Sequence, residues 1–519
     1  MAPTDRLIFS AMQKEMKRSK DSLCIEGYPR PFYLSYIMNR FRSFRIVGEL
    51  GGISVNNAIP WHLTGNTQVL VGDYHRHSGG QYSRVSVPQE ADIPMIRRGF
   101  WGASDAVYKV GLNLYANKMN NLENNPLPRV LDIIPDKQPV KPVTFVQSLD
   151  NSYQVDREKL ADLARELSAI FKDYPDLTGT SVSIDGAEME TYRTTSEQVN
   201  IKLPDSYVSI TARATLRDTL GLSQSDQLTL HYRTPAEIPS TESLREQIHS
   251  FAKDLVALKN APELEDYYKG PVLYQGAAVA SIFQQNLLEN NGIYARQMTR
   301  LNTTSIGRKL NKEVMDKRFT ILNYTDRTSY HGVPLTGFYP IDADGIKPEP
   351  VIPIVEKGIL KTMLNGTTPS EYSKQSTGST RFTGINGSRT TTTSIGTLHV
   401  MADKALKEEK MFRQLLKAAK QQKLKEAYVI FCPTHCSLRR LYHVDVKTGK
   451  KTLLKSNSIT LPTLTQLENV VAVSAKEEVV NRVNTTVIYP ASLIVGNLEV
   501  NKSGMVATKE PAILYPLKR

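Results

Sequence analysis

The stretch that decides the fold is PELEDYYKGPVLYQGAAVASIFQQNLLENNG, from Pro262 to Gly292. After an acidic turn, the apolar run Val272-Leu273-Tyr274 predicts a short buried strand. A break at Gly276 is followed by apolar residues at helical spacing, so we expect a helix to begin at Ala277. Asn290-Asn291-Gly292 is typical of a helix C-terminus, where a residue with positive φ is favoured. A buried strand therefore leads directly into a buried helix.

The apolar face of this helix is interrupted by the polar cluster Gln284, Gln285 and Asn286. Taken alone, the pattern indicates a core helix with one edge facing solvent, because a helix packed on one side keeps polar residues on the other.

The segment Tyr268-Lys269-Gly270-Pro271-Val272-Leu273 and the small-residue helix after it resemble the lead into the zinc helix of the TldD/PmbA family. This family is also called the modulators of DNA gyrase or peptide-maturation proteins. Its active members carry His-Glu-x-x-x-His, in which two histidines hold Zn²⁺ and the glutamate activates the metal-bound water. Aligned with this chain, Gln284 stands at the first histidine, Gln285 at the glutamate and Glu289 at the second histidine. The resemblance therefore implies a zinc helix without its ligands, and we expect no zinc.

The resemblance extends over most of the chain and implies an α+β fold. We expect an N-terminal α/β domain with antiparallel strands and helices, in two parts (1–125 and 126–261), and a β-rich C-terminal domain of the TldD/PmbA type (262–519). Within the second part, Asp185-Gly186 predicts a hairpin turn. Within the C-terminal domain, the lysine-rich stretch from Ala402 to Glu426 predicts an amphipathic helix.

Two further segments resemble parts of the family. Asp342 and Asp344 lie in a sequence similar to its Asp-Asp-x-Gly turn, and although two carboxylates at this spacing suit Ca²⁺, the turn interpretation is favoured. The Ser/Thr/Gly-rich run from Ser376 to Ser394 resembles the flexible loop beside the family's substrate cleft, through its expected substrate-loop residues Asn386, Gly387 and Arg389.

One other group of residues has the chemistry of a metal site. Cys432, His435 and Cys436 lie within five residues, and His443 follows. Structural zinc usually takes a second ligand pair at a distance, and His443 is the one candidate. The alternative is that a buried strand ends at Cys432 and that this cysteine is a core residue without metal.

Charge and cysteine content limit the classes of function. Lys and Arg (65) exceed Asp and Glu (52), which gives a net charge of +13, but no block of five or six like charges occurs. No aromatic-rich nucleic-acid module accompanies the lysines, so nucleic acid is not the expected partner. With three cysteines and no signal-peptide pattern, a cytoplasmic location is favoured, and an exported form with its leader removed stays open. No apolar run reaches the length of a membrane span.

The sequence leads to three hypotheses about function. The first is a non-catalytic subunit of a peptidase complex that trims or matures peptides, with peptide as ligand and a TldD-like catalytic subunit or a second copy as partner. The second is an active zinc metallopeptidase whose ligands have moved to Cys432, His435, Cys436 or His443. The third, a DNA-binding regulator, depends only on the basic composition and the family's older name.

Overall fold

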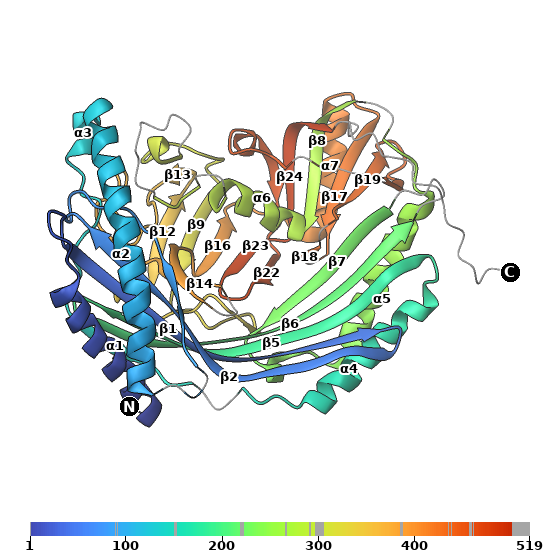
Figure 1. Ribbon diagram of the computed structural model, residues 1–519. Coiled ribbons are helices and arrows are strands. Elements are labelled where there is room, and N and C mark those ends of the chain that lie inside the picture. The colour runs from blue at the N-terminus through green and yellow to red at the C-terminus, as the bar shows by residue number, and fades with distance from the viewer. Residues whose placement is uncertain are drawn as a thin grey trace.

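The first half of the chain builds one sheet of long antiparallel strands that curves beneath the smaller sheets of the second half (Figure 1). A computed structural model describes residues 2–88, 90, 92–149, 153–217, 223–264, 267–289, 292–295, 306–384, 388–433, 435–436, 438–455, 459 and 461–500.

The N-terminal sheet has the strand order β18-β7-β6-β5-β1-β2-β3, and β4 adds a parallel pairing to β6. All its other pairings are antiparallel, as expected for strands joined by short turns. The strands are β1 (Pro31–Glu49), β2 (Gly52–Val71), β3 (Ser83–Ser86), β4 (Val143–Val146), β5 (Leu177–Thr195), β6 (Val199–Arg217), β7 (Ser223–Tyr232) and β18 (His435–Cys436).

The hairpin turn predicted at Asp185-Gly186 is wrong, because β5 runs through it without interruption. Asp185 pairs with Arg45 on one side and with Ser209 on the other. Gly186 is required for close packing instead: an added Cβ would lie 2.4 Å from the Phe44 ring. A glycine in a strand can mark such a close approach as well as a turn.

Helices cover this sheet at its two ends. Helices α1 (Pro3–Ser22) and α2 (Ile93–Asn124) form one apolar cluster with the strands, and α4 (Arg157–Ala169) and α5 (Thr241–Ala257) form another. Short helical segments complete this half: α3 (Arg129–Asp132), η1 (Ile170–Asp173), η2 (Pro235–Glu237) and η3 (Leu258–Asn260). Among the helices of the described residues, none is long and apolar enough to cross a bilayer.

The second half contains two mixed six-stranded sheets with α6 (Ala277–Leu287) packed between their strands. One sheet has the order β13-β12-β9-β16-β23-β22 and the other β20-β19-β17-β8-β24-β21. Their strands are β8 (Tyr268–Gly276), β9 (Phe319–Tyr324), β12 (Val351–Glu356), β13 (Ile359–Leu360), β16 (Thr397–Ala402), β17 (Glu426–Cys432), β19 (Arg440–Asp445), β20 (Lys451–Leu454), β21 (Val470–Val473), β22 (Glu477–Asn481), β23 (Thr486–Pro490) and β24 (Ser492–Val500).

The remaining elements of this half are two small hairpins and three helical segments. They are β10 (Ser329–Tyr330) with β11 (Val333–Pro334), β14 (Thr380–Thr383) with β15 (Thr390–Thr393), α7 (Glu408–Gln421), η4 (Ile306–Lys309) and η5 (Gln466–Glu468). The helix predicted from Ala402 to Glu426 is therefore shorter than expected, because its ends belong to β16 and β17. As predicted, its lysines face solvent, because the opposite face of α7 buries Met411 and Leu415.

The two halves share apolar and polar contacts. Ile37 and Ile201 of the N-terminal sheet form one apolar cluster with Ile341 and Phe382 of the C-terminal half. The strand β18 extends the N-terminal sheet from within the C-terminal half. The predicted α+β class with antiparallel strands first and a β-rich domain second is confirmed, and the exact domain boundaries stay predictions.

Candidate functional site

The helix α6 begins where the sequence predicts, and a single glycine explains why. Gly276 has φ 61° and ψ −146° at the N-cap, a backbone conformation that is essentially restricted to glycine. An added Cβ there would lie 2.3 Å from the carbonyl oxygen of Cys432 on β17. Glycine at this position thus allows the sharp turn from strand into helix and the close approach of β8 to β17.

The polar residues of α6 line a cavity of about 220 Å³ at the end of the helix. Gln284 is buried, Gln285 is half-buried and Glu289 is exposed, so the three positions aligned with the zinc motif lie around one space. The rest of the lining consists of Ala277, Ala280, Ser281, Cys432, Arg439, Leu461, Val480 and Arg482.

Two arginines from distant parts of the chain complete this cavity, which we call the α6 pocket. Arg482 follows β22, and its Nη2 donates a hydrogen bond of 2.6 Å to Oε1 of Gln284. Arg439 precedes β19, and burial lowers its pKa while Tyr274 and Glu289 raise it. Sequence reasoning missed both arginines, because nothing in their local sequence points to this helix.

The residues of the α6 pocket do not fit zinc. Structural and catalytic zinc take imidazole, thiolate or carboxylate donors, whereas the buried position here is the amide Gln284, already bonded to a guanidinium. Cys432 is disulfide-bonded and therefore offers no thiolate. Across the part of the chain that the structure describes, no three His, Cys, Asp or Glu residues group as metal ligands.

The second set of metal candidates lies on three different strands, β17, β18 and β19. Nε2–H of His443 on β19 donates a 3.1 Å hydrogen bond to Oε2 of Glu426 on the neighbouring strand β17. His435 and Cys436 form β18 at the edge of the N-terminal sheet, and their side chains lie outside the described residues. The disulfide bond of Cys432 was not predicted from the three cysteines of the sequence, which favoured a cytoplasmic location.

The expected substrate loop is partly a hairpin anchored on the N-terminal sheet. Arg389 beside β15 is 2% exposed, and its guanidinium donates to Oγ1 of Thr191 at 3.0 Å and to Oδ2 of Asp205 at 2.8 Å. The backbone oxygen of Arg389 accepts a 2.6 Å hydrogen bond from Asn66. Asn386 and Gly387 lie outside the described residues. As described, Arg389 connects the two halves of the protein.

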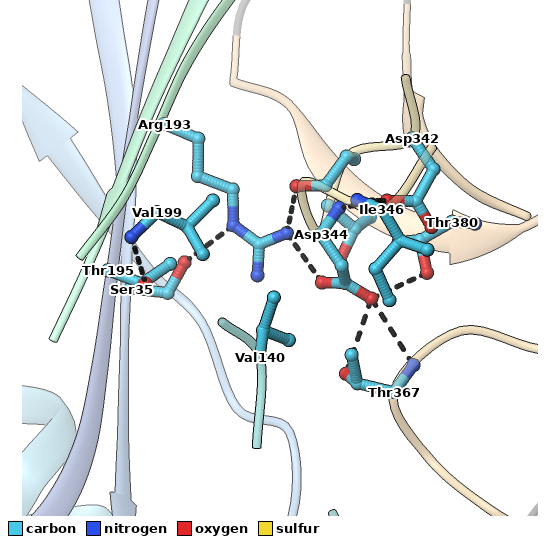
Figure 2. Close-up of polar contacts among 12 residues, drawn as sticks. Ser35, Val140, Arg193, Thr195, Val199, Asp342, Asp344, Ile346, Thr367 and Thr380 are labelled. Atoms are coloured by element: carbon cyan, nitrogen blue, oxygen red, sulfur yellow. Dashed lines mark hydrogen bonds and ion pairs between the residues drawn. The ribbon is translucent and has the colours of Figure 1, made fainter. Parts of the chain in front are cut away.

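The Asp342–Asp344 turn forms a second polar connection between the halves, shown in Figure 2. Oδ1 of Asp342 accepts from the backbone N–H groups of Asp344 (2.9 Å) and Ile346 (2.8 Å), as a turn requires. Nη1 of Arg193, on β5, donates to Oδ1 of Asp344 at 2.7 Å, and Thr380 donates to Oδ2 at 2.6 Å. Both carboxylates are thus engaged by protein donors.

These surroundings shift the pKa values of the two carboxyl groups in opposite directions. Burial, with the charge of Asp344 beside it, raises the pKa of Asp342 to about 8. Burial also acts on Asp344, but the guanidinium of Arg193 outweighs it and lowers the pKa of that carboxyl. The pair therefore holds one permanent negative charge opposite Arg193.

A larger cavity of about 330 Å³ lies between the N-terminal sheet and the C-terminal half. Both halves contribute charged side chains to its wall, among them Asp205, Glu237, Arg381 and Arg389. Arg381 is held by backbone oxygens of Gly337 and Ile395.

Residues 268–501 match the PmbA/TldA metallopeptidase C-terminal domain. The match covers somewhat less than half of the chain. Its PmbA/TldA domain begins with β8 and contains α6, so the resemblance to the TldD/PmbA family predicted from the sequence is confirmed.

Solved structures show that the similarity in fold covers nearly the whole chain. The structure of TldE from Thermococcus kodakarensis aligns with a TM-score of 0.58 and 12% sequence identity. The alignment covers 94% of this chain and 99% of the TldE chain. A protein from Thermotoga maritima, named as a modulator of DNA gyrase, has a TM-score of 0.58 and 15% identity over 95% of this chain and 99% of its own. A counterpart from Bacteroides thetaiotaomicron, with the same naming, has a TM-score of 0.56 and 12% identity over 95% and 98%. The search of curated proteins found no match.

Proposed function

We propose that this protein is the non-catalytic subunit of a peptidase complex that trims or matures peptides. The observation that carries the proposal is the chemistry of the α6 pocket. In a PmbA/TldA domain, the positions aligned with the zinc motif hold Gln284, Gln285 and Glu289, and Arg482 is bonded to the first of them. A fixed guanidinium beside the buried amide opposes binding of a divalent cation, because like charges at short distance repel.

The retained fold supports a role in holding peptide. The cavity between the halves is lined by charged and polar groups from both, and the anchored β14–β15 hairpin forms one wall. An extended peptide needs such paired backbone and side-chain contacts along its length. The subunit would contribute these contacts, while a TldD-like chain supplies the metal and the attacking water.

A partner is part of this proposal. TldE is the name of one structure that shares this fold, and a subunit without a metal site depends on another chain for chemistry. The partner is a TldD-like catalytic subunit, and a homodimer is the alternative arrangement. Either assembly would bury more than about 1,000 Å² of surface, the size that separates biological interfaces from crystal contacts.

The test combines metal analysis with a peptidase assay. We expect the purified chain to contain no stoichiometric zinc and to cleave no peptide, and to form a stable complex with a co-expressed TldD-like chain in light scattering. Chelator-sensitive cleavage by the chain alone would overturn the proposal. In that case, loss of zinc in Cys436→Ser would identify the relocated-ligand peptidase.

A gain-of-function variant tests the same point from the other side. The triple substitution Gln284→His, Gln285→Glu and Glu289→His restores the donor types of the zinc motif at the α6 pocket. We expect measurable zinc affinity only when Arg482→Ala is added, because Arg482 otherwise occupies the first position. Equal zinc affinity with and without Arg482→Ala would show that this arginine does not exclude the metal.

A further inference from the structure

The α6 pocket places two guanidinium groups where the sequence resemblance puts a metal ion. Arg439 comes from the segment before β19 and Arg482 from the segment after β22, and both line the same cavity as Gln284. Arginine stays protonated at every physiological pH. The pocket therefore carries positive charge of its own at the place where the resemblance puts a cation.

Neither guanidinium is neutralised by a close ion pair. Among the described residues, no carboxylate oxygen lies within 4 Å of the side-chain nitrogens of Arg439 or Arg482. Each guanidinium carries five N–H donors. Arg482 uses one of them on Gln284, and no hydrogen bond joins the Arg439 side chain to another described residue. Among the described residues, most of the N–H donors of these two arginines therefore have no hydrogen-bond partner.

The one acidic group at the pocket does not cancel this charge. Glu289 is exposed at the end of α6, and its negative charge acts on Arg439, whose pKa it raises against the effect of burial. With two guanidinium groups and one carboxylate, the lining keeps a net positive charge. Arg439 is half-buried, which strengthens its attraction for an anion because the effective dielectric constant is lower there than in water, whereas Arg482 is exposed.

We propose that the α6 pocket binds the C-terminal carboxylate of a peptide through Arg439 and Arg482. The planar guanidinium matches a carboxylate with two parallel N–H···O hydrogen bonds, which makes arginine the preferred residue for this group. The inference rests on the proposed function, because it takes the ligand to be a peptide.

The size of the pocket agrees with a chain end. Its volume of about 220 Å³ is below the roughly 300–1,000 Å³ of sites that enclose a whole small-molecule ligand. A terminal residue with a small side chain fits such a space, and the small side chains of Ala277, Ala280 and Ser281 form its helical wall. Gln285 adds a half-buried amide that can donate to the second carboxylate oxygen.

The direct test compares two peptides that differ only at the C-terminus. The probes are N-terminally fluorescein-labelled tetra-alanine with a free carboxylate and the same peptide with a C-terminal amide, titrated with the full chain and followed by fluorescence anisotropy. We expect the acid to bind at least about tenfold more tightly than the amide, because the ionised carboxylate accepts charge-assisted hydrogen bonds that the neutral amide does not form. Equal binding of the two peptides, or binding of neither, would overturn the inference.

Variants with opposite expected signs localise the effect. Arg439→Gln and Arg482→Gln should each bring binding of the acid close to that of the amide, whereas Glu289→Gln should tighten binding of the acid a few-fold. Arg413→Gln on the exposed face of α7 removes the same charge away from the pocket and should change nothing. Unchanged binding of the acid in both arginine variants would refute the assignment, and the tightening by Glu289→Gln cannot arise from loss of folding.

The two proposals fail in different ways. A chain that contains zinc and cleaves peptide overturns the proposed function, whatever its preference for a terminal carboxylate. A chain without zinc that joins a TldD-like partner but ignores the terminal carboxylate overturns only the present inference.

Discussion

The ion pair between Arg193 and Asp344 should be among the strongest single contacts between the two halves of the protein. The Arg193 side chain is 3% exposed and that of Asp344 is 9% exposed, with 2.7 Å between Nη1 and Oδ1. Arg193 also donates to Oγ of Ser35 at 3.0 Å and to the hydroxyl of Tyr33 at 3.1 Å. Replacing Arg193 with Met would leave a buried carboxylate without its cation.

The size of the effect follows from what Asp344 retains. Removal of one partner of a buried ion pair typically costs about 3–5 kcal/mol of stability. Thr380 and Thr367 still donate hydrogen bonds to Oδ2 of Asp344, so we expect Arg193→Met to cost about 3 kcal/mol, the lower end of that range. Asp344→Asn should cost a similar amount, because it leaves Arg193 buried and uncompensated.

The double variant Arg193→Met/Asp344→Asn separates the ion pair from general packing. It removes both charges, so its loss of stability should be at least about 2 kcal/mol smaller than the sum of the single losses. Urea unfolding monitored by far-ultraviolet circular dichroism gives these free energies of unfolding. Lys109→Met, which breaks the exposed pair of Lys109 with Asp105, should change stability by no more than about 0.5 kcal/mol. Additive single losses, or a cost below about 1 kcal/mol for Arg193→Met, would refute this reasoning.

Three further predictions concern stability and pH. The pKa of Asp342 is raised to about 8 in the folded protein, compared with about 4 in the unfolded chain. The stabilisation that this shift gives the fold is fully present below about pH 4 and is lost as the pH rises toward 8. Urea midpoints of the wild type should therefore fall from pH 5 to pH 8 relative to Asp342→Asn, and parallel curves would contradict the shift. Gly276→Ala should lower the free energy of unfolding by about 3 kcal/mol, because alanine is strained at this positive φ and its Cβ would overlap the Cys432 carbonyl. Gly102→Ala in α2, where an added Cβ meets nothing within 4 Å, should be neutral or stabilising in the same urea titrations. Arg440→Met should lower the free energy of unfolding by about 3–5 kcal/mol, because the buried carboxylate of Asp226 in the other half would lose its ion-pair partner at 2.8 Å. An unchanged melting temperature would show that this ion pair does not stabilise the contact between the halves.

The sequence by itself determined the local features of this protein. Hydrophobic spacing predicted the strand before Gly276 and the helix after it, because burial of one face imposes a period that can be read directly. The resemblance also aligned Gln284, Gln285 and Glu289 with the histidines and glutamate of the zinc motif, since a motif on one helix needs no tertiary information. The α+β class followed from the order of these elements and from the family resemblance.

Only the tertiary structure decided how distant residues meet. Arg439 and Arg482 reach the α6 pocket from segments next to β19 and β22, and no local pattern in either segment encodes that convergence. Arg389 lies in a polar run that suggested a loop, yet its partners Thr191 and Asp205 on the N-terminal sheet bury it. The physical reason is common to all three: the position of a guanidinium group depends on how distant elements pack together, whereas sequence periodicity reports only which face of its own element is apolar.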